Sequence, residues 1–241
     1  AKFAHLTLAH RQLAVVQGDH WVASSDILIQ EGDVWNSEAR PLWMNINENQ
    51  KTYAITQTGG YAAFGTTSGS HGLLVGVNAN VPVATDINLT GGYFAVPELT
   101  TWITSSAINL TIKEGGHFAI VKGIKANAGN CRATITVEDA GTVELQGPTV
   151  SVYGGGANTL TKEITFNGGR ITTGQVEASL NIPVAFTGTA TPTELSSAVG
   201  STLLLDADNT GAGTIEVTQG KVAIARATAL ASTATTVKAG A

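Results

Sequence analysis

The chain has 241 residues, of which 13% are charged and 28 are glycine, so its polar surface must rest on threonine, serine and asparagine more than on ion pairs. Its net charge of −5 and the absence of any run of lysine or arginine exclude nucleic-acid binding through a basic patch. The single cysteine, Cys131, excludes an internal disulfide, and no apolar run approaches the roughly 18 residues that a membrane-spanning helix needs.

One pattern recurs along the chain: apolar residues alternate with polar ones on both sides of a glycine. Alternation is the period of a strand with one buried face, and glycine suits the bend between two such strands because it tolerates positive φ. The pattern first occurs at 27–34, within an N-terminal region that also holds Trp21, Trp35 and Trp43. Terminal units of a repeat array cover its open core, so we interpret residues 1–60 as an aromatic-rich N-terminal cap. The other interpretation makes the three tryptophans a carbohydrate-binding platform for sugar rings.

The next part of the chain, residues 45–85, is the least regular. The segment 50–56 alternates like a strand, whereas 58–72 is rich in glycine, serine and threonine, which favour turns. We therefore predict that 58–72 forms a loop that leaves the stacked units. Loops of this kind carry function more often than the scaffold does.

From residue 87 the pattern becomes orderly, and two successive copies, 110–120 and 135–145, align with an offset of 25 residues. Further copies occur at 87–96, 164–171 and 214–224. Units of two short strands cannot bury their apolar face alone, and a period of about 20–50 residues indicates that they stack. The residues predicted to face inward in the two central copies are Leu110, Ile112, Phe118, Ile120, Ile135, Val137, Val143 and Leu145.

These repeats predict an all-β fold in which residues 1–241 form one β-solenoid of the right-handed parallel β-helix type. A β-sandwich is the alternative, because it would use the same alternation with antiparallel pairing. The two folds differ in register. Parallel pairing of residue i with residue i+25 supports the solenoid, and hairpin pairing across Gly116 supports the sandwich.

The strand, Asn-Gly-Gly bend and strand of Ile164 to Ile171 resembles the autotransporter-associated β-strand repeats of bacterial surface proteins. The units at 110–120 and 214–224 are similar, and the resemblance covers residues 87–224. It implies a right-handed parallel β-helix that acts as a displayed stalk, an adhesin or a self-associating protein. It also implies an extracellular or cell-surface location.

Parallel β-helices also host polysaccharide lyases and glycoside hydrolases, which generally need clustered carboxylates or a calcium ion. The 25-residue offset puts Glu114 and Asp139 in equivalent bends, about 5 Å apart along the stack. A solvated edge is the other interpretation of this pair. Asp206 and Asp208 resemble the opening of a calcium loop, although Val217 stands where an EF-hand has its glutamate. We expect no other cofactor, because the five histidines lack a metal-ligand spacing.

The functional expectation is a non-enzymatic, secreted structural or adhesive protein that associates with itself through β-strands, as a homo-oligomer, filament or surface-layer subunit. Residues 3–16 and 228–238 are strand-compatible, and a low charged fraction leaves sheet edges open to pairing. Residues 225–241 are therefore predicted to be a C-terminal tail or a strand donated to a neighbour. A host or matrix glycan is a further candidate partner. The alternatives are a carbohydrate-active β-helix enzyme and a carbohydrate-binding module.

Overall fold

The computed structural model describes residues 7–8, 15–17, 20–23, 26–37, 40–44, 52–65, 72–76, 79, 81–230 and 234–238. This part of the chain is all-β, with one 3₁₀ turn at Ala157–Thr159 and no α-helix. The strands are β1 (Thr7–Leu8), β2 (Val15–Gln17), β3 (His20–Ala23), β4 (Ile27–Ile29), β5 (Val34–Ser37), β6 (Leu42–Met44), β7 (Thr52–Phe64), β8 (Leu73–Val75), β9 (Ala84–Thr101), β10 (Ala107–Ile112), β11 (His117–Ala126), β12 (Arg132–Leu145), β13 (Thr149–Tyr153), β14 (Thr161–Thr173), β15 (Glu177–Asn181), β16 (Ala185–Phe186), β17 (Thr193–Ser196), β18 (Thr202–Leu205), β19 (Thr214–Gln219), β20 (Lys221–Ile224) and β21 (Ala234–Val237).

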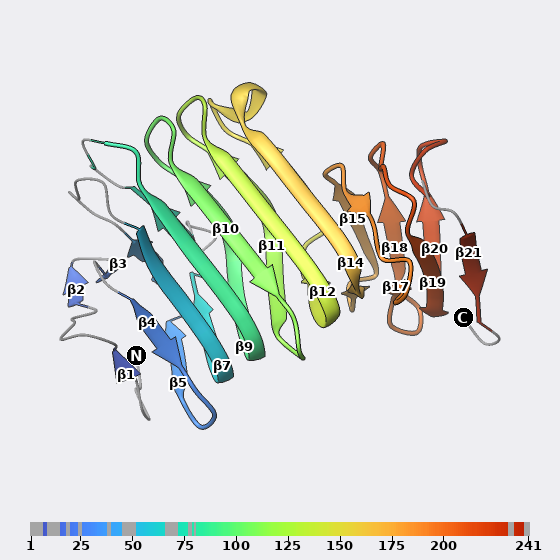
Figure 1. Ribbon diagram of the computed structural model, residues 1–241, viewed down its shortest axis with the longest axis horizontal. Coiled ribbons are helices and arrows are strands. Elements are labelled where there is room, and N and C mark those ends of the chain that lie inside the picture. Colours follow the sequence, from blue (N-terminus) through green and yellow to red (C-terminus); the bar gives the residue numbers. More distant parts are fainter. Residues whose placement is uncertain are drawn as a thin grey trace.

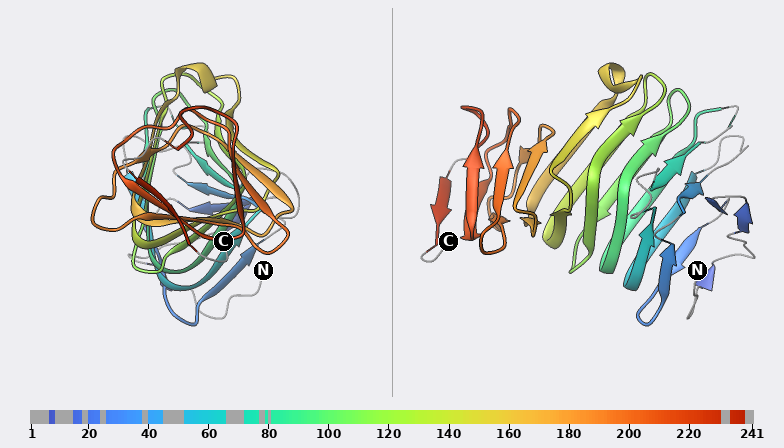
Figure 2. Two further views of the ribbon diagram at one scale, coloured as in Figure 1. Left: turned by 90° about the vertical axis from the view of Figure 1, so that its right-hand side faces the viewer. Right: turned by 180° about the vertical axis from the view of Figure 1, so that it is seen from behind.

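Strand pairing in the central repeats is parallel and has the predicted register. Leu110 of β10 pairs with Ile135 of β12, and Phe118 of β11 pairs with Val143 of β12. Both pairs join residues 25 positions apart, so the hairpin across Gly116 that a sandwich would need does not form. Figure 1 shows β7, β9, β11, β12 and β14 side by side as long strands. Seen along this row, the chain runs round a three-sided outline (Figure 2, left).

The inward-facing residues form continuous rows from strand to strand. All eight residues predicted to face inward are buried. One row joins Ile55, Ile87, Leu110, Ile135 and Ile164 through successive pairings. Aromatic rings also stack inside, with centroid distances of 5.8 Å from Phe64 to Phe94 and 6.4 Å from Phe94 to Phe118. Equivalent positions of neighbouring repeats therefore pack on one another, which a single unit could not do.

Glycine in the bends serves the predicted purpose and a second one. Positive φ falls on Gly115 (90°), as predicted for glycine in a bend, but not on Gly116 or Gly141. A Cβ at Gly116 would lie 2.4 Å from the carbonyl oxygen of Leu89 in the neighbouring repeat, and Gly141 meets a backbone oxygen at the same distance. These glycines therefore allow backbones of successive bends to approach closely.

The strands become shorter after β14, and this leaves a step in the row. On one edge β14 pairs with β12 from Thr161 to Thr173. On its other edge, β16 covers Thr165 and Phe166, and β17 covers Arg170 and Ile171. Residues 161–164 thus have no strand partner on that edge among the described residues. Figure 1 shows the change from the long strands to the short ones beyond β14.

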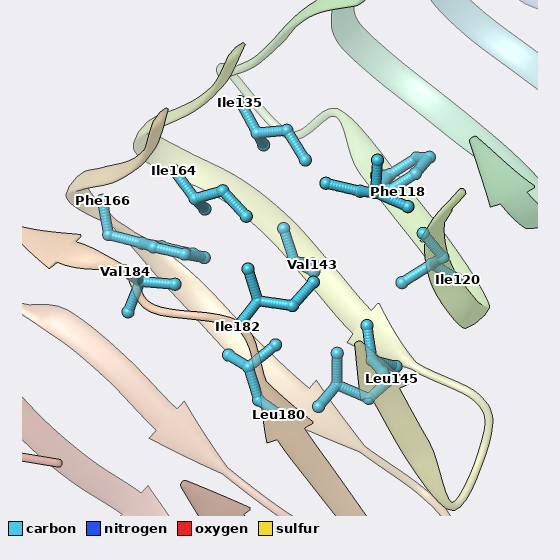
Figure 3. Close-up of a pocket in the computed structure, with 12 residues that line it drawn as sticks. Phe118, Ile120, Ile135, Val143, Leu145, Ile164, Phe166, Leu180, Ile182 and Val184 are labelled. Atoms are coloured by element: carbon cyan, nitrogen blue, oxygen red, sulfur yellow. The ribbon is translucent and has the colours of Figure 1, made fainter. Parts of the chain in front are cut away.

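A small apolar cavity of about 30 Å³ lies inside the core beside this step. Its wall consists of aliphatic and phenylalanine side chains from β11 to β14 and from the segment 180–184. Figure 3 shows Ile135 and Ile164, Val143 and Leu145, and Ile182 and Val184 converging on it from different strands. The shorter turn into β16 leaves the core slightly underfilled at this level.

One prediction from the sequence needs correction. Residues 58–64, predicted to begin a loop, continue strand β7, because Tyr61 to Ala63 pair with Tyr93 to Ala95 of β9. Residues 66–71 of the predicted loop lie outside the described residues. In the segment 225–241, strand β21 pairs in parallel with β19 of its own chain. At the other end β1 and β2 pair antiparallel with β4 and β3, unlike the remaining strand pairs.

Candidate functional site

The tryptophans proposed as a sugar platform do not share one surface. Trp35 is 1% exposed and packs edge-on against Phe64 with a centroid distance of 4.7 Å. Its burial removes it from the carbohydrate candidates, because a sugar ring needs an open aromatic face. Trp43 is half-buried on β6, where its backbone pairs with Val22 of β3. The side chain of Trp21 lies outside the described residues.

The acidic pair proposed for calcium makes contacts within its own chain. Arg226 Nε lies 3.3 Å from Asp206 Oδ1, and the Thr228 hydroxyl donates to Asp208 Oδ1. Both contacts join each aspartate to the residue 20 positions further on. No group of three acidic, histidine or cysteine side chains within metal-binding reach occurs among the described residues. Calcium binding here stays a prediction.

The bend carboxylates take the equivalent positions that the repeat offset predicts. Glu114 and Asp139 both have positive φ, and Asp139 pairs with Gly168 in the next repeat. Asp139 also lines a polar cleft of about 200 Å³ that contains Arg170 and Glu194. Arg170 donates from Nε to Glu194 Oε2 at 2.9 Å. The cleft therefore holds the guanidinium of Arg170, which is paired with Glu194, and the carboxylate of Asp139 as a second acidic group.

A cluster that the sequence analysis missed lies on the outward side of β7, β9, β11 and β12. Tyr61, Tyr93 and His117 occupy equivalent positions of three successive strands. The rings of Tyr61 and Tyr93 are parallel with centroids 5.4 Å apart, and His117 follows at 4.8 Å from Tyr93. They pack over the small residues Ala63, Ala95 and Ala119, which are buried although they lie between inward-facing neighbours. We call these three rings the tyrosine–histidine row.

The tyrosine–histidine row ends on a carboxylate. His117 Nε2 lies 2.8 Å from Glu144 Oε2, and the Tyr93 hydroxyl donates to the same oxygen at 3.4 Å. The hydrogen bond from His117 is the main cause that lowers the pKa of Glu144 below its ordinary value. Burial, followed by the negative charge of Glu144, raises the pKa of Tyr93 to about 12. Glu144 is therefore an ionised acceptor and Tyr93 a neutral donor at physiological pH.

A second carboxylate, Glu98, is held in a similar way further along β9. It is 2% exposed, accepts the hydroxyl protons of Tyr153 and Thr100, and lies 4.0 Å from Lys125 Nζ. Burial and the contact with Glu98 raise the pKa of Tyr153. Gly123 pairs with Glu98 on one side and Ser151 on the other, and Lys125, two residues later, pairs with Thr100 and Tyr153.

Both clusters join side chains two repeats apart, since Tyr93 reaches Glu144 and Tyr153 reaches Glu98. The 24-residue offset from Tyr93 to His117 is a sequence signal for the tyrosine–histidine row. The repeats were aligned only on their inward-facing residues, so this outward row was not predicted. Each carboxylate already accepts several hydrogen bonds, which suits positioning of neighbouring repeats better than proton transfer.

Among the described residues no helix is long and apolar enough to cross a membrane. Comparison with protein-family models, with curated proteins and with solved structures finds no match to this chain.

Proposed function

We propose that the chain is a β-solenoid of the right-handed parallel β-helix type. The support is the parallel register across the central repeats, with the same inward rows in each. Handedness follows from a general rule, because connections between parallel strands of one sheet are right-handed in about 98% of cases.

We further propose that it is a non-enzymatic extracellular structural or adhesive protein that associates with itself through β-strands. The observation that carries this proposal is the C-terminal end of the stack. Strands β20 and β21 pair on one edge with β18 and β19, and no described strand pairs with their other edge. Ile224 is 53% exposed and Val237 66% exposed on these strands. An open strand edge with apolar side chains is a template for a strand of a second copy.

A second candidate, a carbohydrate-active enzyme, is supported by the cleft that holds Asp139, Arg170 and Glu194. Two carboxylates and a cation in one cleft are a set that glycoside chemistry uses. In that case Asp139→Asn would abolish turnover of a polysaccharide substrate. Binding that survives the substitution without any turnover would instead favour a carbohydrate-binding module.

Sedimentation velocity over a range of protein concentrations, with electron microscopy of the same samples, tests self-association. The test variant carries Ile224→Lys and Val237→Lys, which put charges on the open edge. The matched control carries Val176→Lys and Val199→Lys, because Val176 (82% exposed) and Val199 (91% exposed) lie in the turns before β15 and β18 and not on β20 or β21.

We expect the wild type and the control to form larger species as concentration rises, and the test variant to stay monomeric. A wild type that sediments as a monomer throughout rejects the proposal. Equal association of all three proteins rejects β20 and β21 as the contact.

A further inference from the structure

A groove of about 530 Å³ runs along the outer surface at the step beyond β14. Its sides are polar residues of β12 and β14 and the segment 183–185, and its floor includes Ile164 and Val184. The same two residues also line the apolar core cavity. The groove therefore leads from solvent to the core at the level where the strands shorten.

The edge of β14 that borders this groove carries backbone groups without a strand partner. Thr161 donates its N–H to the carbonyl of Cys131, towards β12. Successive residues of a parallel strand direct their N–H and C=O groups to opposite neighbours, so those of Lys162 point into the groove. The next strand, β16, pairs only from Thr165 onward. This edge has the geometry that accepts a further strand.

Charge in the groove is not balanced. Glu163 is paired with Arg132, whose Nη2 lies 2.7 Å from Glu163 Oε2. Lys162 is exposed and forms no ion pair with a described residue. It takes an inward position, since it pairs with the buried Ala133, yet it reaches solvent because no strand follows it. An incoming strand would meet Lys162 and, two residues later, Ile164 on the same face.

We propose that this groove binds an extended peptide strand of a partner protein by adding it to the edge of β14. The peptide carries an acidic residue opposite Lys162 and an apolar residue two positions later, opposite Ile164 and Val184. The unpaired backbone edge of β14 requires a polypeptide as the ligand. The ammonium of Lys162 selects the carboxylate, and the apolar floor selects the apolar residue two positions later. This inference does not depend on association at the ends of the stack.

Fluorescence anisotropy with labelled four-residue peptides, which match the four unpaired residues 161–164, tests the inference. The probe is Thr-Glu-Thr-Val, and one comparison peptide has lysine in place of glutamate. A third peptide has the probe sequence with N-methylated amides, which keeps the side chains but removes backbone donors. The protein variants are Lys162→Glu and, as a matched control in the bend after β10, Lys113→Glu. Equal thermal unfolding of the variants shows that the fold is intact.

We expect saturable binding of the probe and at least about tenfold weaker binding of the N-methylated peptide, since N-methylation removes the backbone donors that pair with the edge of β14. Lys162→Glu should weaken binding of the glutamate peptide and strengthen binding of the lysine peptide, whereas Lys113→Glu should bind both peptides as the wild type does. Absence of saturable binding, or equal affinity for the N-methylated peptide, overturns the proposal. Oligomers of the protein alone that excess probe peptide dissociates in sedimentation velocity also overturn it, because the occupant would then be a second copy.

Discussion

The apolar cavity beside the step makes Val143→Ile a stabilising substitution. Val143 faces inward on β12, lines the cavity and is 9% exposed. Isoleucine adds one methyl group to the same β-branched side chain, so the strand conformation need not change. The cavity of about 30 Å³ is close to the size of that group.

Two estimates of the gain agree. Cavities cost about 24 cal/mol per Å³, so removing about 30 Å³ returns about 0.7 kcal/mol. Burying one further methylene-sized group contributes about 0.8 kcal/mol. For a chain of this length, a change of this size corresponds to a rise in Tm of about 2 °C.

The matched control is Val137→Ile, on the same strand and also inward. Val137 has no exposed surface and does not line the cavity, and its Cγ1 packs so close to Gly169 that a Cβ there would lie 2.6 Å from it. There, overpacking should cost about 1–3 kcal/mol. Urea unfolding followed by circular dichroism measures both variants. A Val143→Ile protein that is as destabilised as Val137→Ile would refute the reasoning, because the core would then be equally full at both positions.

Three further predictions concern the outward clusters and the bends. Glu144→Gln should lower the free energy of unfolding by about 1–2 kcal/mol at pH 7 and by much less near pH 3. The lowered pKa of Glu144 stabilises the fold above the ordinary carboxyl pKa of 4.5, and this contribution is lost as pH falls through the lowered pKa. Glu163→Gln, in an exposed ion pair, should change the free energy of unfolding little at either pH in the same urea titrations. Gly123→Ala should lower the free energy of unfolding by more than about 3 kcal/mol, since its Cβ would lie 2.1 Å from the Ser151 carbonyl oxygen and φ is +117°. Gly174→Ala, whose Cβ would have nothing within 4 Å, should stay within about 0.5 kcal/mol of wild type. Similar melting temperatures for the two variants would contradict this. Spectrophotometric titration should show a tyrosine with a pKa of about 12 that Tyr93→Phe removes, and stability should fall as pH rises between about 10 and about 12, because only the unfolded chain then loses that proton; an unchanged titration curve in Tyr93→Phe would show that another tyrosine accounts for it.

The local pattern of the sequence was sufficient for the strands and their buried faces. Alternation around Gly116 and Gly141 indicated two strands per unit, and the 25-residue offset indicated which residues pair, as Leu110 and Ile135 do. This worked because inward positions of stacked repeats must all be apolar, and the requirement repeats with the chain's own period. The same pattern misplaced 58–64, where glycine and threonine were taken for a loop although β9 pairs with this segment. Pairing with a neighbouring strand can override weak local propensity.

Other features depend on which side chains the stacking brings together. Tyr93 and Glu144 are 51 residues apart, and their contact exists only because two intervening turns of chain have nearly equal length. The step beyond β14 likewise arises from the short connection between β15 and β16. Within β14, the only sequence signal of this step is Lys162, a charged residue in an inward position. The sequence alone determined the strand period, the inward rows and the parallel register, because each depends on residues a fixed distance apart. Only the tertiary structure decided the outward clusters, the core cavity and the open edge of β14, because these depend on how turns of unequal length align when they stack.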